Sequence, residues 1–120
     1  MTRLALVVLL LATSAVPSLA AEKHVYRLDS VIATAVAGGV AIQANGAVLS
    51  GGWSHVRLKL SHSDAHTLVV EFLAQPPASG AAVVTGLLPV SAHVTVRGGH
   101  GVTSVRAIAE ANEVTAQVLR

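Results

Sequence analysis

The segment that decides the fold is Val90–Arg97, which reads Val-Ser-Ala-His-Val-Thr-Val-Arg. Its apolar residues stand at every second position and alternate with polar or charged residues. A period of two places the apolar side chains on one face of a strand, toward a core, and the polar ones toward solvent. The same alternation occurs in Val56–Leu60 and in Glu113–Val118. These segments predict half-buried antiparallel strands in an all-β protein.

Glycine and proline divide the chain beyond residue 20 into short segments that are rich in Val, Ile, Leu and Thr, which suit strands. We predict about seven strands, and their spacing favours a single antiparallel β-sandwich over a small barrel. The predicted strands span 23–35, 40–44, 47–60 (broken or continuous at Gly51-Gly52), 67–75, 82–96 (broken near Gly86–Pro89), 102–109 and 113–119.

At two predicted turns the sequence is compatible with more than one local structure. Asn45-Gly46 is a type I′ hairpin signal, and the alternative is a bulge inside one longer strand. Ala and Glu within 104–117 favour a helix. The β-branched residues there, and the alternation after Asn112, favour instead a hairpin that turns at Ala111-Asn112.

The composition excludes several classes of protein. The chain has 120 residues, of which 52% are hydrophobic and 12% charged, which excludes a wholly disordered chain. It has no cysteine, which excludes disulfides, cysteine zinc sites, iron–sulfur clusters and a cysteine nucleophile. The formal net charge is +2 and the charges are interspersed, so the chain lacks the basic stripe typical of a nucleic-acid partner.

Residues 1–20 have the pattern of a secretory signal peptide: Arg3 near the start, the apolar run Leu4–Ala12, and the small residues Ser18 and Ala20 before the cleavage point. The apolar run is shorter than the roughly 20 residues that a membrane span needs. An uncleaved N-terminal anchor is the alternative. We expect cleavage after Ala20 or one residue later, which leaves 21–120 as one β-sandwich domain without a transmembrane span, in the periplasm or secreted.

The densest cluster of potential metal ligands is the segment His62-Ser63-Asp64-Ala65-His66, between two predicted strands. Imidazole and carboxylate groups suit zinc or copper, so His62, Asp64 and His66 are the candidate metal ligands, and His100 is a fourth if its loop lies nearby. The alternative is a polar hairpin loop whose side chains solvate the turn.

No catalytic constellation and no cofactor-binding motif emerges from the sequence. Ser63 adjoins His62, but neighbours in an extended segment point to opposite sides, and there is no Gly-x-Ser-x-Gly elbow. The carboxylates lack the context of a glycosidase pair. Glu71 stands in an otherwise apolar strand, where it is either a buried acid or faces solvent. Trp53 is either an exposed stacking platform or, as is more common, a plug at one end of the core.

Three motifs carry a resemblance: Gly52-Trp53-Ser54 with the strand that follows it, the acidic-aromatic segment Val70–Pro77, and Val105-Arg106 leading to Asn112. In these the chain resembles small exported bacterial β-proteins of uncharacterised function. The resemblance covers about half of the chain beyond residue 20 and implies a β-domain of the cell envelope, without catalytic residues to carry over.

Together these features predict an exported, soluble, non-enzymatic binding or structural domain of the bacterial envelope. Its expected partner is another envelope protein, bound through an edge strand or an apolar patch. The alternative function is a periplasmic zinc- or copper-binding domain that uses the segment His62–His66. A small hydrolase is the least favoured of the three.

Overall fold

The computed structural model describes residues 21–98 and 101–120. The predicted signal peptide and His100 lie outside the described residues. The described part is all-β, with eight strands and no helix, so it holds no helix that could cross a membrane. The strands are β1 (Lys23–His24), β2 (Arg27–Val36), β3 (Gly39–Ser50), β4 (Ser54–Ser63), β5 (Thr67–Gln75), β6 (Thr85–Arg97), β7 (Ser104–Ile108) and β8 (Glu113–Leu119).

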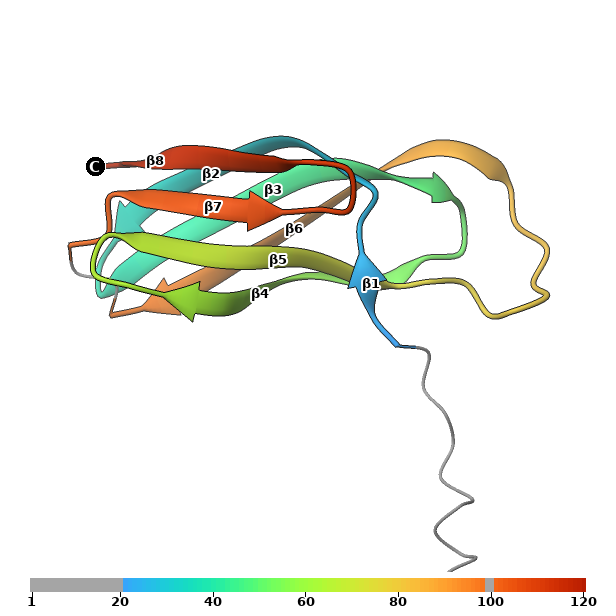
Figure 1. The fold of residues 1–120 in the computed structure, drawn as a ribbon, viewed down its shortest axis with the longest axis horizontal. Coiled ribbons are helices and arrows are strands. Elements are labelled where there is room, and N and C mark those ends of the chain that lie inside the picture. The colour runs from blue at the N-terminus through green and yellow to red at the C-terminus, as the bar shows by residue number, and fades with distance from the viewer. Residues whose placement is uncertain (1–20, 99–100) are drawn as a thin grey trace, which may run out of the picture.

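The strands form one sheet that curls into a half-barrel (Figure 1). Across the sheet the order is β4-β5-β7-β8-β2-β3-β6, and the short strand β1 pairs with the far end of β5. Strands β4 and β6 are the two outermost strands, and they approach each other on the open side of the curl without a hydrogen-bonded register among the described residues.

The predicted antiparallel sandwich is wrong in its strand directions, although the all-β class is confirmed. Strand β5 pairs parallel with β7 over five residue pairs from Thr67 and Ser104 onward. Strands β2 and β8 pair parallel at Ala33 with Val118 and at Thr34 with Leu119. A parallel pair needs a crossover connection. Between β5 and β7 the chain makes this crossover through β6. Strand β6 pairs with β3, and the chain then returns to place β7 beside β5.

The core lies inside the curl and consists mainly of small branched aliphatic side chains around one aromatic ring. Phe72 of β5 is the largest fully buried side chain, and no buried polar side chain accompanies it in the described part. The alternating segments supply the inner layer, with Leu58 and the half-buried Val90, Ala92, Val94 and Val96 against the core, but the inward placement predicted for Leu60 is wrong, because its side chain is 39% exposed. The largest fully buried members are Val25, Val40, Ile42, Val48, Leu68, Val70, Phe72 and Val105.

The predicted Asn45-Gly46 hairpin is wrong, because β3 runs straight through both residues. Gly46 is buried and pairs with Leu28 of β2 on one side and Val90 of β6 on the other. A β-carbon at position 46 would overlap the carbonyl oxygen of Arg27 and would lie 3.1 Å from Cε2 of Phe72. Glycine is therefore needed here for close packing rather than for a turn. The irregularity lies on β2, between Leu28 and Ser30.

We expect Gly46→Ala to lower the free energy of unfolding by about 2 kcal/mol, because the backbone of β2 must move to admit the methyl group. Urea unfolding of the residue 21–120 chain measures this. Gly80→Ala adds a methyl group that meets no atom within 4 Å, although its backbone φ of +84° adds strain. A smaller loss for Gly46→Ala than for Gly80→Ala would contradict the packing role of Gly46.

The predicted hairpin at Ala111-Asn112 is confirmed, and it excludes the helix over 104–117. Strands β7 and β8 pair antiparallel across this turn, from Ile108 with Glu113 to Ser104 with Gln117. The Asn112 side chain also ties the turn to β2. Its Oδ1 accepts a hydrogen bond from the Leu28 N–H and its Nδ2 donates to the Leu28 carbonyl, both at 2.9 Å.

Candidate functional site

The outward edge of β6 is a long main-chain surface that no described strand pairs with, although β4 approaches β6 on the open side of the curl. Gly98 N–H donates to the Gly38 carbonyl at 2.8 Å, and the same register runs from Gly39 and Arg97 to Val48 and Leu88 without a shift. Hydrogen-bonded pairs alternate with non-hydrogen-bonded pairs in an antiparallel ladder. Even-numbered residues of β6 therefore direct their N–H and C=O groups toward β3, and odd-numbered residues direct theirs outward.

Four outward N–H groups follow from this alternation, those of Ser91, His93, Thr95 and Arg97. Among the described strands none pairs with them, because β6 pairs only with β3. Pro89 is also odd-numbered, so its missing N–H falls on the outward side, where an edge strand tolerates proline. We call the outward main-chain groups of residues 89–97 the free edge of β6.

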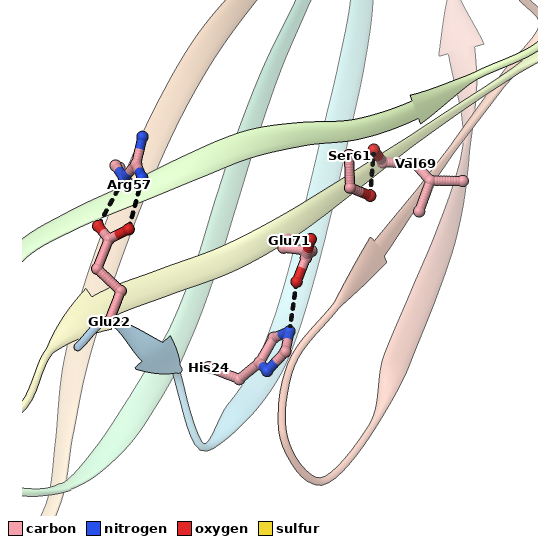
Figure 2. Close-up of polar contacts among 6 residues, drawn as sticks. All are labelled: Glu22, His24, Arg57, Ser61, Val69 and Glu71. Carbon is pink, nitrogen blue, oxygen red and sulfur yellow. Dashed lines mark hydrogen bonds and ion pairs between the residues drawn. The ribbon is translucent and has the colours of Figure 1, made fainter.

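The other outermost strand, β4, offers a less regular edge. Its register with β5 shifts twice, between Ser54 and Arg57 and between Leu60 and His62. At the second shift the Ser61 hydroxyl donates to the Val69 carbonyl at 3.2 Å (Figure 2). Bulges bend an edge strand and hinder pairing with another chain. The regular edge of β6 is therefore the better template for an added strand.

An exposed apolar surface adjoins the start of β6. The segment before β6 lies at the right of Figure 1. It is held to the chain after β3 by a hydrogen bond of 2.8 Å from Gly51 N–H to the Val84 carbonyl. Five large apolar side chains remain exposed there, and we call them the apolar end: Leu49 (48%), Val83 (38%), Val84 (72%), Leu87 (51%) and Leu88 (36%). Together with the free edge of β6 they make up the candidate interaction site.

The structure places the candidate metal ligand His62 at the end of β4, and Asp64 and His66 in the turn between β4 and β5, all exposed. The carboxylate oxygen Oδ1 of Asp64 accepts hydrogen bonds from the N–H groups of His66 and Thr67, each at 2.8 Å. The segment therefore forms a polar turn, which was the predicted alternative to a metal site. Among residues 21–98 and 101–120 no group of three or more metal-ligating side chains is arranged to hold an ion. The metal hypothesis stays a prediction.

The two N–H donors of the turn lower the pKa of Asp64 below its ordinary value of 3.8. A carboxyl with a lowered folded-state pKa adds stability above its unfolded-state pKa and loses that contribution as the pH falls through the folded-state value. We expect NMR titration of the Asp64 carboxyl to give a midpoint below 3.8. Ser63→Ala should leave this midpoint unchanged, whereas a midpoint at or above 3.8 would show that the turn does not form in solution.

Glu71 faces outward from the sheet, half-buried, and not into the core. Its Oε1 lies 2.9 Å from Nε2 of His24 on β1 (Figure 2). The pair connects β1 to β5 and accounts for a carboxylate in an apolar strand. Nothing in the sequence indicates this partner, because the two residues are 47 positions apart.

Trp53 lies half-buried, packed against the core, and also lines a shallow groove of about 490 Å³ with Glu22, Lys23, His24 and Glu110. Trp53 therefore lines the groove as well as packing against the core. Next to the groove Arg57 donates to both carboxylate oxygens of Glu22, with Nε 2.6 Å from Oε2 (Figure 2). This contact, more than any other, lowers the pKa of Glu22. The carboxylate is thus already occupied by a cation of the chain itself.

Comparison of the chain with protein-family models, with curated proteins and with solved structures finds no match. The resemblance to small exported bacterial β-proteins therefore stays a prediction.

Proposed function

We propose that this chain is an exported, non-enzymatic binding domain of the bacterial envelope that takes up an extended segment of another protein as an additional strand on β6. The observation that carries the proposal is the free edge of β6, with its outward N–H groups unpaired in the described part of the chain. A strand added there forms main-chain hydrogen bonds, and side chains on alternate positions provide selectivity.

The apolar end supports the same proposal. Soluble monomeric proteins seldom expose contiguous large apolar side chains without a use for them. Here they stand at the start of the strand whose edge is free, so an added segment that runs along β6 also covers apolar surface. The pattern of residues 1–20 supports export to a compartment that holds protein partners.

Amide hydrogen exchange tests the proposal with peptide probes, short segments in which valine alternates with glutamine, glutamate or lysine. We expect at least one probe to slow the exchange of the Ser91, His93, Thr95 and Arg97 amides. Exchange of amides in β5 should not change. Protection elsewhere, or none with any probe, would rule out strand addition on β6.

A proline at Thr95 provides the matched variant. Thr95→Pro removes one outward N–H, as Pro89 already does, and leaves the groups that face β3 in place. We expect this variant to fold and to bind the best probe at least tenfold more weakly than the unchanged chain, since both a hydrogen bond and the flatness of the edge are lost. Unchanged binding would contradict the proposal.

A further inference from the structure

The side chains on the two outermost strands are unusual in their charge. Of the six Asp and Glu residues in the sequence, none lies on β4 or β6. These strands instead carry Arg57, Lys59 and Arg97, together with His55, His62 and His93. Both outermost strands therefore contribute basic side chains and no carboxylate of their own, although Glu22, which precedes β1, pairs with Arg57 of β4.

The cation on β6 also lacks a carboxylate partner within the described part of the chain. Arg27, Arg57 and Arg106 each pair with a carboxylate, at 2.8 Å from Asp29, 2.5 Å from Glu22 and 2.6 Å from Glu113. Arg97 makes no such pair among the described residues, and its side chain is exposed beside the free edge. Lys59 on β4 makes no direct pair with a carboxylate of residues 21–98 or 101–120 either, although it lies near enough to Glu22 to help lower the pKa of that carboxyl.

From this charge distribution we infer that the segment added to the free edge of β6 is acidic, with Asp or Glu alternating with apolar residues. The inference rests on the proposed function and specifies its partner. Acidic side chains on an added strand would stand beside Arg97 and His93, and opposite charges on neighbouring strands stabilise the pairing. Complementary potentials also speed association and reject partners of the same sign.

A second copy of this chain is a poorer occupant. Its own outermost strands carry no carboxylate, so pairing β6 with β6 or with β4 leaves Arg97 without a countercharge. Cationic residues on edge strands are a known protection against edge-to-edge pairing of identical chains. The same charges that disfavour self-association select an acidic partner.

The peptide probes named above test the inference by fluorescence anisotropy on the residue 21–120 chain. We expect the valine–glutamate peptide to bind at least fivefold more tightly than the valine–lysine peptide, with the valine–glutamine peptide between them. Added salt should reduce this difference, because it screens exposed charges.

Two variants with the same change in net charge test whether Arg97 itself contributes to binding of the glutamate peptide. Arg97→Gln should weaken binding of the glutamate peptide by about two- to fivefold, the range for one exposed charge pair. Arg106→Gln makes the same change in net charge on β7, and it should leave this affinity unchanged. An equal loss in the two variants would overturn the inference, because it would reflect net charge alone.

The outcomes separate the inference from the function it rests on. Equal binding of all the peptides with protection of the β6 amides overturns the acidic partner and keeps strand addition. The absence of binding and of protection with every peptide overturns both. Preferential binding of the glutamate peptide with protection of residues 91–97, lost in Arg97→Gln, supports both.

Discussion

Phe72→Ala is expected to lower the free energy of unfolding by about 3–5 kcal/mol, the range for truncating a buried aromatic side chain. Phe72 is fully buried and is the only phenylalanine in the chain, whereas Trp53 packs against the same core only half-buried. The surrounding side chains are short aliphatics on several strands, and they cannot close the cavity without moving the sheet. A domain of this size is stable by roughly 5–15 kcal/mol, so the loss is a large fraction of the total.

Urea unfolding followed by circular dichroism measures this prediction. Leu60→Ala is the control, because Leu60 lies 39% exposed on β4 and its truncation leaves no enclosed cavity. We expect the control to lose about 1 kcal/mol or less. A loss for Phe72→Ala no larger than for Leu60→Ala would show that the ring is not the centre of the core.

The second prediction with a large expected effect compares proline substitutions at two neighbouring positions of β6. Val94→Pro should lower the free energy of unfolding by about 3 kcal/mol, because Val94 is even-numbered and directs its N–H toward Ile42 of β3. Proline there removes a ladder hydrogen bond and leaves a carbonyl of β3 unsatisfied. Thr95→Pro removes only an outward N–H and should cost about 1 kcal/mol or less.

Thermal and urea unfolding of the two variants side by side measure the difference. The comparison also shows whether Thr95→Pro is a folded protein, as the binding test requires. Equal losses in the two variants would mean that both N–H groups are paired, and that the edge of β6 is covered in solution. A larger loss for Thr95→Pro than for Val94→Pro would contradict the register itself.

The metal hypothesis and the strand-edge proposal use different parts of the molecule, so they can be separated. His62 lies at the end of β4, and Asp64 and His66 lie in the turn that follows, whereas the free edge lies on β6. Replacing both histidines with alanine should leave peptide binding unchanged. Calorimetric titration of the same variant with zinc and copper examines the metal hypothesis independently.

Much of the fold could be predicted from local patterns. The alternation in Val90–Arg97 predicts which residues face inward, because the pleat of a strand fixes side-chain direction every second residue. The turn at Asn112 and the strands around it follow from the same reasoning. The split of the predicted strand 23–35 into β1 and β2 could not be predicted, since Val25 and Tyr26 break it only through contacts with β5 and with the turn after β7.

The candidate site, like the fold, could be predicted from the sequence only in part. The sequence by itself determined that the chain forms strands, which residues of Val90–Arg97 face the core, and that β4 and β6 carry no carboxylate, since all of these depend on residue type and on a period of two. Only the tertiary structure decided that Gly46 is a packing position and that β5 and β7 run parallel. It also decided that β4 and β6 stand at the edges and that no described strand pairs with the outward side of β6, because strand order depends on contacts between residues that are distant in the chain.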